Sequence, residues 1–458
     1  MLTLWVAASA LGADPCLTPR VLDAKRGLAP APHVYALSGP AGVGEVGERA
    51  ARAADKPVYG TPYPRHYNSP NFTVNWLSGS GNLGLAEHVA QVLEQGWVAL
   101  IEEQGWAVPV SADTFKLWVM LDDTLAGTGF TTTYDSAEYP QGYPVMYLNP
   151  DYSVDQSFMD SVAVHELHHA IQYALRDYSG EGAEAWYWEA SAQWAAELAL
   201  PDNDRYAEAA GWYAPTAWYR YDSMEDAHPY GMFLVNAWVD EHGPVSEGMK
   251  LTWELGADRP GEDWAILLSD ALGIDVSEVW GGFTGAYAAQ TLRESAQYEP
   301  ALVEATVVDG LEGEVAMLGT DYHRVEGTAT LTVERLDASR AVVLSVGDRV
   351  GEELQVEAGD IVAVTGLAEP TAGYRLVLSE SKSGPEDTGD TADTGEDGTS
   401  PPGDTDTPGD TGDPALADET ASTGGGCGCR TAEPVGGGLL VVALIAWRRQ
   451  RSMEIDRT

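Results

Sequence analysis

The sequence HELHH at residues 165–169 is the part of this chain best suited to chemistry, because it contains the spacing HExxH. It lies in the stretch FMDSVAVHELHHAIQYAL, whose apolar residues recur at the spacing of an amphipathic helix. On a helix, His165 and His169 are one turn apart on one face, so both imidazoles can reach the same metal ion, while Glu166 lies beside them. These residue types at this spacing predict a zinc site that activates water for hydrolysis.

His168 is a further histidine in the same window. A metal-binding pair of His165 and His168 is geometrically possible. The pair of His165 and His169, however, leaves Glu166 where it can reach a water on the metal. We therefore expect His168 to be a structural residue.

A catalytic zinc site normally has a third protein ligand and keeps one position open for water. The HExxHxxGxxH pattern of metzincins would place this ligand at Leu175, so that pattern is excluded. The next helical stretch contains Glu189, twenty positions after His169, in an otherwise apolar and aromatic window. An unpaired carboxylate would be costly there, which favours Glu189 over its neighbours Glu184 and Glu197 as the third ligand.

In this region the chain resembles the gluzincin metalloproteases, whose third ligand is a Glu on the helix after HExxH. The residues that match this context are Trp186, Glu189, Ala192 and Trp194. The resemblance covers roughly residues 70 to 290 and implies a zincin-like catalytic domain. It implies that His165, His169 and Glu189 bind Zn²⁺, that Glu166 is the general base, and that the substrates are proteins or peptides.

The chain departs from thermolysin-like members of that group four residues after the third ligand, where they have an Asp and this chain has Gln193. A glutamine can orient an imidazole by a hydrogen bond but adds no charge. Gln172 is another candidate for this role, so the residue that orients the ligands stays open between the two.

Residues 72–77, 115–121 and 144–150 have the composition of strands, and a helical pattern runs over 85–103. The resemblance implies that the strand just before the active-site helix, 144–150, is a sheet edge that binds extended substrate by backbone pairing. The GxMEN signature of the aminopeptidase branch is missing from this strand. An endopeptidase is therefore favoured over an aminopeptidase.

Hydrolysis of a peptide bond also needs a donor that stabilises the oxyanion, and the resemblance places a Tyr or His for this purpose on a later helix. Residues 226–243 have a helical apolar period that begins near Pro229 and ends at Gly243. His228 and Tyr230 are the two candidates for the donor in this segment.

Residues 299–380 have a strand pattern in place of the helical patterns before them. In segments such as TATLTVERL and DIVAVTGL, apolar and polar residues alternate, and Gly and Asp turns separate these segments. The sequence therefore predicts an α+β protein. We expect a zincin-like catalytic domain at 56–298, with a mixed sheet and active-site helices, followed by a small all-β, sandwich-like domain at 299–380.

The formal charge of −46 excludes nucleic acid and anionic lipid as expected partners, because the summed field repels both. Part of this charge lies in residues 381–426, where repeats such as DTGDTADTGEDGT contain almost no apolar side chain. Such a segment cannot bury enough surface to fold, so it is expected to be a disordered acidic linker.

The N-terminal residues 1–13 form a short apolar run that ends in small residues, as in a secretory signal peptide. Residues 14–55 are a possible propeptide or N-terminal extension. Cys16 is the only cysteine outside the C-terminal tail, and the residues before it do not form a lipobox. The sequence therefore assigns Cys16 no role.

The C-terminal residues 427–451 combine Cys427 and Cys429 with the apolar run 435–447 and the basic cluster RRQR. This arrangement resembles the myxobacterial C-terminal sorting signals, called MYXO-CTERM. The resemblance implies a short hydrophobic transmembrane helix, processing by sorting machinery and attachment to the cell envelope.

These features together predict a secreted zinc metalloprotease, held at the cell surface or outer membrane, that hydrolyses peptide bonds as an endopeptidase. Two alternatives stay open. A catalytically silent surface adhesin on a protease-like scaffold need not bind zinc, and a zinc hydrolase with a non-peptide substrate shares the metal site but not the substrate groove.

Overall fold

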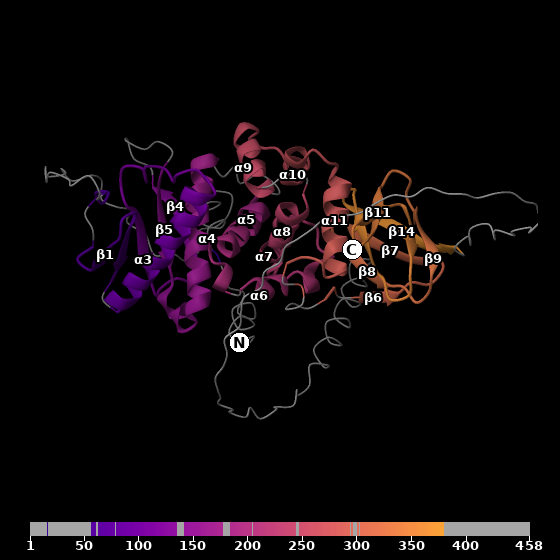
Figure 1. The fold of residues 1–458 in the computed structure, drawn as a ribbon, viewed down its shortest axis with the longest axis horizontal. Coiled ribbons are helices and arrows are strands. Elements are labelled where there is room, and N and C mark those ends of the chain that lie inside the picture. Colours follow the sequence, from indigo (N-terminus) through magenta and orange to yellow (C-terminus); the bar gives the residue numbers. More distant parts are fainter. Residues whose placement is uncertain are drawn as a thin grey trace, which may run out of the picture. The chain divides into compact units, whose positions relative to one another are not determined.

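The computed structural model describes Cys16 and residues 56–379, apart from 61–62, 78, 135–141, 177–183, 204, 244–246, 294, 296–299 and 302 (Figure 1). This part of the chain contains one mixed sheet, then a run of helices and then two further sheets, which confirms the α+β expectation. The predicted signal peptide, acidic linker and sorting tail lie outside the described residues. Of the predicted N-terminal extension 14–55, only Cys16 is described. Residue 380, the last of the predicted β domain, also lies outside the described residues.

A five-stranded mixed sheet forms the N-terminal part of the fold, with the strand order β1-β2-β3-β5-β4 (Figure 1). Strands β2, β3 and β5 are parallel, whereas β1 and β4 are each antiparallel to their neighbour. The strands predicted at 72–77, 115–121 and 144–150 are confirmed as β2, β3 and β5, within two residues at each end. The bounds are β1 His66–Asn68, β2 Phe72–Trp76, β3 Leu117–Leu121, β4 Gly129–Tyr134 and β5 Tyr143–Leu148.

The edge of this sheet differs from the expectation. The strand just before the active-site helix, β5, is paired on both sides, with β3 and with β4, so it is not an edge strand. The outer position belongs to β4, which precedes β5 in the sequence and runs antiparallel to it. The expectation that 144–150 is the edge was wrong, because β4 pairs with the outer side of β5. The sequence pattern of one strand does not show which other strands pair with it.

Both faces of the sheet are buried, and successive side chains of each strand point to opposite faces. Val74, Val119 and Leu148 face the helices, whereas Trp118 and Tyr147 belong to a second cluster with Tyr59 and Phe130. Helices α3 (Leu83–Trp97) and α4 (Gln156–Leu175) pack against strands of this sheet and against each other. The parallel central strands are therefore covered on both sides, as such sheets require.

The predicted helix at 85–103 is confirmed as α3, but its last part, η1 (Val98–Glu103), has the wider π-helical hydrogen bonding. A glycine allows α3 to approach α4 closely. A Cβ added at Gly96 would lie 3.1 Å from Val164 Cγ2 and 3.3 Å from Leu167 Cδ2.

Helix α4 begins where β5 ends. Asn149 caps the short 3-10 helix η2 (Pro150–Val154), and the Asp155 side chain then accepts a hydrogen bond from Phe158 N at the start of α4. From Ala163 to Tyr173 every residue of α4 is buried. Its polar side chains in this stretch therefore need hydrogen-bond or metal partners inside the protein.

Helix α5 (Ala185–Ala199) packs along α4 and carries Glu189. The following segments surround α5 with aromatic side chains, including Trp253, Trp264 and Trp280, which are all fully buried. The predicted helical region 226–243 is confirmed, although it is divided between α7 and α8. The bounds are η3 Pro201–Asn203, α6 Tyr206–Ala210, η4 Ala214–Thr216, α7 His228–Gly231, α8 Phe233–His242, α9 Gly248–Asp258, α10 Trp264–Leu272 and α11 Val276–Ala288.

The C-terminal described region contains two sheets, with the orders β11-β10-β13-β8-β6 and β12-β9-β14-β7. Valines and leucines of both sheets form a single apolar cluster, such as Leu344 and Val364 from one sheet and Leu331 and Leu376 from the other. The bounds are β6 Val303–Thr306, β7 Leu311–Ala316, β8 Thr320–Arg324, β9 Ala329–Arg335, β10 Val342–Val346, β11 Arg349–Gly351, β12 Glu353–Val356, β13 Ile361–Gly366 and β14 Thr371–Ser379.

This two-sheet region packs on the helical region through α11, which contacts β10 and β13. Thr284 Oγ1 lies 3.2 Å from both Ser345 Oγ and Thr365 Oγ1 at this contact. All described residues belong to one compact unit. The predicted domain boundary at 298/299 stays a prediction. Among the described helices, none is long and apolar enough to cross a membrane.

Candidate metal centre

The side chains of His165, His169 and Glu189 meet between α4 and α5. His165 Nε2 lies 3.1 Å from Glu189 Oε2, and His169 Nε2 lies 3.5 Å from Glu189 Oε1. All three residues are buried. The two imidazole rings are 4.7 Å apart and nearly perpendicular, so one carboxylate faces both Nε2 atoms.

These distances fit a shared metal ion. Ligand atoms bound about 2.0–2.1 Å from a tetrahedral Zn²⁺ lie about 3.3–3.4 Å from one another. Burial lowers the pKa of His165 to about 3 and that of His169 to about 4, so both imidazoles are neutral and have a lone pair for a metal. A fully buried carboxylate between two neutral rings is otherwise expensive, and a divalent cation would balance its charge.

Gln172 orients one of these rings. His169 Nδ1 lies 2.7 Å from Gln172 Oε1, and Gln172 Nε2 donates to Trp188 O and to Ser191 Oγ, at 3.0 Å each. Because the amide nitrogen has its own acceptors, the amide oxygen faces the ring, and His169 donates from Nδ1. The lone pair of His169 is thereby placed on Nε2, the atom that faces Glu189.

Gln193 makes a different contact, because its Nε2 lies 3.3 Å from Glu197 Oε1. Of the two glutamines that the sequence left open, the structure therefore places Gln172 against a histidine. The other acidic candidates for the third ligand lie in other contacts, since Glu184 pairs with Arg176 at 3.3 Å. His168 packs edge-on against the Trp106 ring, with a centroid distance of 4.7 Å.

Glu166 is fully buried and is held by the edge strand β4. Thr131 Oγ1 lies 2.8 Å from Glu166 Oε2 and 2.8 Å from its backbone oxygen. A Cβ added at Gly129 would lie 3.1 Å from Glu166 Oε1, so this position on β4 leaves room for the carboxylate. Sequence reasoning missed both Thr131 and Gly129, and their spacing from HExxH contains no signal that could have identified them.

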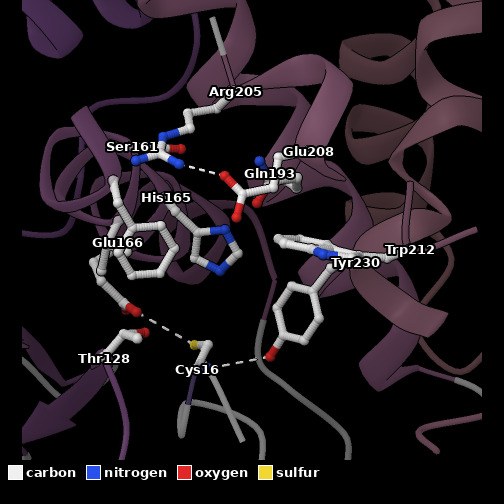
Figure 2. A pocket seen from close by; sticks show the side chains of 12 residues that line it. Cys16, Thr128, Ser161, His165, Glu166, Gln193, Arg205, Glu208, Trp212 and Tyr230 are labelled. Carbon is white, nitrogen blue, oxygen red and sulfur yellow. Dashed lines mark hydrogen bonds and ion pairs between the residues drawn. The ribbon is translucent and has the colours of Figure 1, made fainter. Parts of the chain in front are cut away.

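The two candidate oxyanion donors on α7 point to different places. Tyr230 lines the pocket beside the metal centre, and its ring lies 6.1 Å from that of His165 (Figure 2). His228 is buried elsewhere, with Nδ1 3.1 Å from Thr216 Oγ1 and its ring 5.6 Å from Tyr219. The structure therefore brings Tyr230, and not His228, to the site.

The pocket continues from His165 along α4 toward α6. Phe158, Val162 and Trp212 form apolar parts of its lining. Arg205 also lines it, and its guanidinium contacts Glu208 (Figure 2). The same guanidinium contacts Asp155 and lies over the Phe158 ring. Two carboxylates therefore already balance the charge of Arg205 in this pocket.

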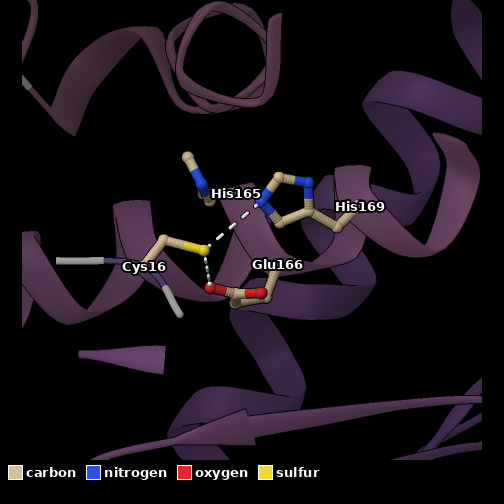
Figure 3. A group of neighbouring side chains, drawn as sticks. All are labelled: Cys16, His165, Glu166 and His169. Carbon is tan, nitrogen blue, oxygen red and sulfur yellow. Dashed lines mark hydrogen bonds between the residues drawn. The ribbon is translucent and has the colours of Figure 1, made fainter. Parts of the chain in front are cut away.

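Cys16 is the unexpected member of the site. Its Sγ lies 3.3 Å from Glu166 Oε1 and 3.4 Å from His169 Nε2 (Figure 3). The donor atoms of Cys16, His165, Glu166 and His169 all lie within 4.8 Å of one another. The sequence assigned Cys16 no role, because nearly 150 residues separate it from the motif and no local pattern connects them.

A family model described as a family of unknown function (DUF6055) matches residues 48–253. This range contains HExxH, Glu189 and Tyr230, but neither Cys16 nor the two-sheet region. No curated protein matches the chain.

Proposed function

We propose that this protein is a zinc-dependent metallopeptidase of the gluzincin type. One observation carries the proposal. The Glu189 carboxylate lies between the Nε2 atoms of His165 and His169, and Glu166 lies beside them at the edge of the sheet.

The surrounding fold supports a zincin-like assignment. A mixed sheet ends in the antiparallel strand β4, the HExxH helix α4 packs beneath β4 and β5, and the helix that follows supplies the Glu ligand. An edge strand can bind an extended peptide by backbone pairing along its outer side. This geometry favours a peptide over a compact non-peptide substrate.

The chemistry needs a metal, a base and a donor. A zinc ion held by His165, His169 and Glu189 would make a water more acidic and polarise the scissile carbonyl. Glu166 accepts the proton of that water and delivers it to the leaving amine, while Thr131 keeps its carboxylate in place. Tyr230 donates its hydroxyl hydrogen to the oxyanion as the carbonyl is attacked.

The substrate's backbone pairs with β4, and one of its side chains enters the pocket lined by Phe158, Val162 and Trp212. We therefore expect cleavage next to apolar residues within protein or peptide chains. The predicted signal peptide and sorting tail add secretion and attachment to the cell surface to this proposal, and both lie outside the described residues.

The test separates metal binding from chemistry. Purified protein should contain about one zinc per chain, and His169→Ala should lose most of it. Activity on a peptide library is measured in a Cys16→Ser background, because the Cys16 thiol lies against the proposed base. In that background Glu166→Gln should retain zinc and lose about 100-fold to 10,000-fold in activity.

Glu197→Gln is the matched control, since it neutralises another buried carboxylate of α5, whose Oε1 lies 3.3 Å from Gln193 Nε2. It should retain zinc and activity. An active Glu166→Gln protein contradicts the mechanism. A protein without metal contradicts the whole assignment and favours the adhesin alternative, whereas a zinc protein that cleaves no peptide favours a different substrate.

A further inference from the structure

We propose that Cys16 is an internal fourth ligand of the metal and that its backbone occupies the substrate position, so that the chain inhibits its own active site. This inference rests on the proposed zinc site, and it adds a regulatory segment that neither the family match nor the HExxH motif includes.

The thiol has the position of a metal ligand. A sulfur about 2.3 Å and a nitrogen about 2.0–2.1 Å from a tetrahedral Zn²⁺ lie about 3.5 Å apart. Cys16 Sγ lies 3.4 Å from His169 Nε2. The donor atoms of Cys16, His165 and His169 lie within 4.8 Å of one another. Together with the two histidines and Glu189, the thiolate would supply the fourth ligand, in the place that a catalytic zinc site keeps for water.

The surroundings of the thiol distinguish it from an ordinary buried cysteine. Free cysteines inside proteins usually pack as small apolar residues. Cys16 is only 5 % exposed, yet its Sγ faces a carboxylate oxygen and an imidazole nitrogen (Figure 3). The nitrogen is Nε2 of His169, a proposed zinc ligand, and the carboxylate of Glu166 can accept the thiol proton, so the sulfur has the surroundings of a metal-binding thiolate.

The backbone of Cys16 occupies two further parts of the site. Its N–H donates to Tyr230 Oη at 3.2 Å, and the residue forms a parallel bridge with Gly129 of the edge strand β4. The proposed oxyanion donor and the proposed peptide-pairing edge are therefore both engaged by the same residue (Figure 2). A substrate can bind only when Cys16 leaves.

The closed state displaces the water that hydrolysis needs. Binding of the thiol to zinc would break its S–H bond, form a sulfur–zinc bond and release the metal-bound water. Glu166 Oε1 lies 3.3 Å from the sulfur, so it would take up the thiol proton and return it when Cys16 departs.

The first experiment measures the reactivity of the thiol. In the full chain, Cys427→Ser and Cys429→Ser leave Cys16 as the sole cysteine. With zinc bound, Cys16 should react with an aromatic disulfide reagent at least about tenfold more slowly than after removal of zinc by a chelator, because a metal-bound thiolate is not free to attack. Re-addition of zinc should restore the protection.

The matched control is Glu189→Gln in the same background, which weakens the metal site and leaves the thiol in place. Its Cys16 should react rapidly with or without equimolar zinc. Should this variant fail to fold, the comparison of zinc-loaded and chelated parent protein decides the question by itself.

The second experiment replaces zinc by Co²⁺, whose bond to a thiolate gives a charge-transfer absorption in the near ultraviolet. The parent protein should show this absorption. Cys16→Ser should lose it and keep the visible bands of Co²⁺ bound by the other ligands. Peptide hydrolysis by zinc-loaded Cys16→Ser, and by parent protein alkylated at Cys16, should exceed that of the untreated parent at least about tenfold, or about 1.4 kcal/mol.

The outcomes separate the two proposals. If the parent binds one zinc but Cys16 reacts equally fast with and without it, and cobalt shows no thiolate absorption, the Cys16 inference is wrong and the zinc site stands. If neither the parent nor Cys16→Ser binds zinc, both proposals are wrong. Zinc-dependent protection together with a thiolate absorption supports the inference even before a substrate is known.

Discussion

Replacement of Gln172 by Met should weaken zinc binding by about 10-fold to 100-fold. The methionine has a similar volume but cannot accept the hydrogen bond from His169 Nδ1, which is 2.7 Å long in the structure. Zinc needs the lone pair on Nε2, so the metal-bound state requires a proton on Nδ1. Without Gln172, this buried N–H has no acceptor, and a lost partner of that kind costs about 1–3 kcal/mol.

Most of this cost falls on the metal-bound state. The metal-free histidine can move its proton to Nε2, where the Glu189 carboxylate accepts it, whereas the metal-bound histidine cannot. A penalty of 1–3 kcal/mol corresponds to about 5-fold to 150-fold in the dissociation constant. This range agrees with the usual effect of removing a partner of a metal-binding histidine.

The assay is a zinc titration against a competing chelating dye, with circular dichroism as a check on folding. Gln193→Met is the matched control, because Gln193 lines the same pocket but donates to Glu197. It should bind zinc within about twofold of the parent. Equal affinities for Gln172→Met and the parent, or an equal loss in Gln193→Met, would refute the reasoning about how the histidine is oriented.

Three further predictions use the same structure. In the Cys16→Ser background, Tyr230→Phe should lower kcat about 100-fold, whereas His228→Gln should not, and the reverse pattern would assign the donor to His228. Gly129→Ala places a Cβ 2.9 Å from the backbone oxygen of Tyr147 and 3.1 Å from Glu166 Oε1, so β4 or the carboxylate must shift, and peptide turnover should fall by up to about 100-fold with zinc retained; unchanged turnover would show that β4 does not position the base. Burial raises the pKa of Asp321 from 3.8 to about 6, so its proton is held more tightly in the folded state, and the free energy of unfolding should fall by at most about 3 kcal/mol as pH rises from 4 to 7. Asp321→Asn should flatten this fall in thermal melts across that range, and an unchanged slope would remove Asp321 as its cause.

Much of the fold could be predicted from local patterns. Strand β3 (LWVML) is apolar at every position, as buried parallel strands often are. Strand β5 (YPVMYL) is similar, whereas β2 (FTVNW) alternates apolar and polar residues. Helices α3, α4 and α5 have helical composition. Strand β4 was missed because three consecutive threonines interrupt the apolar residues of GFTTTY. Its pairing outside β5 then made the strand before α4 an interior strand instead of the edge.

In the candidate site, too, the residues that share one helix could be predicted from the sequence. The spacing of His165, Glu166 and His169 lies within one helix, so the 3.6-residue period places them together whatever the rest of the chain does. Glu189 could be named because a carboxylate in an aromatic window is improbable without a partner. The structure then places its oxygens against both imidazoles.

The sequence by itself determined the candidate metal ligands His165, His169 and Glu189, because HExxH and the Glu189 context are local and their geometry follows from helices. Only the tertiary structure decided which residues act on that centre from elsewhere. It brought Gln172 to His169, turned Tyr230 toward the site and His228 away, and set Thr131 of β4 against Glu166. It also placed Cys16 at the same centre, a contact across nearly 150 residues of sequence. Contacts of this kind arise from the packing of whole elements and from the path of the chain between them, which no local periodicity records.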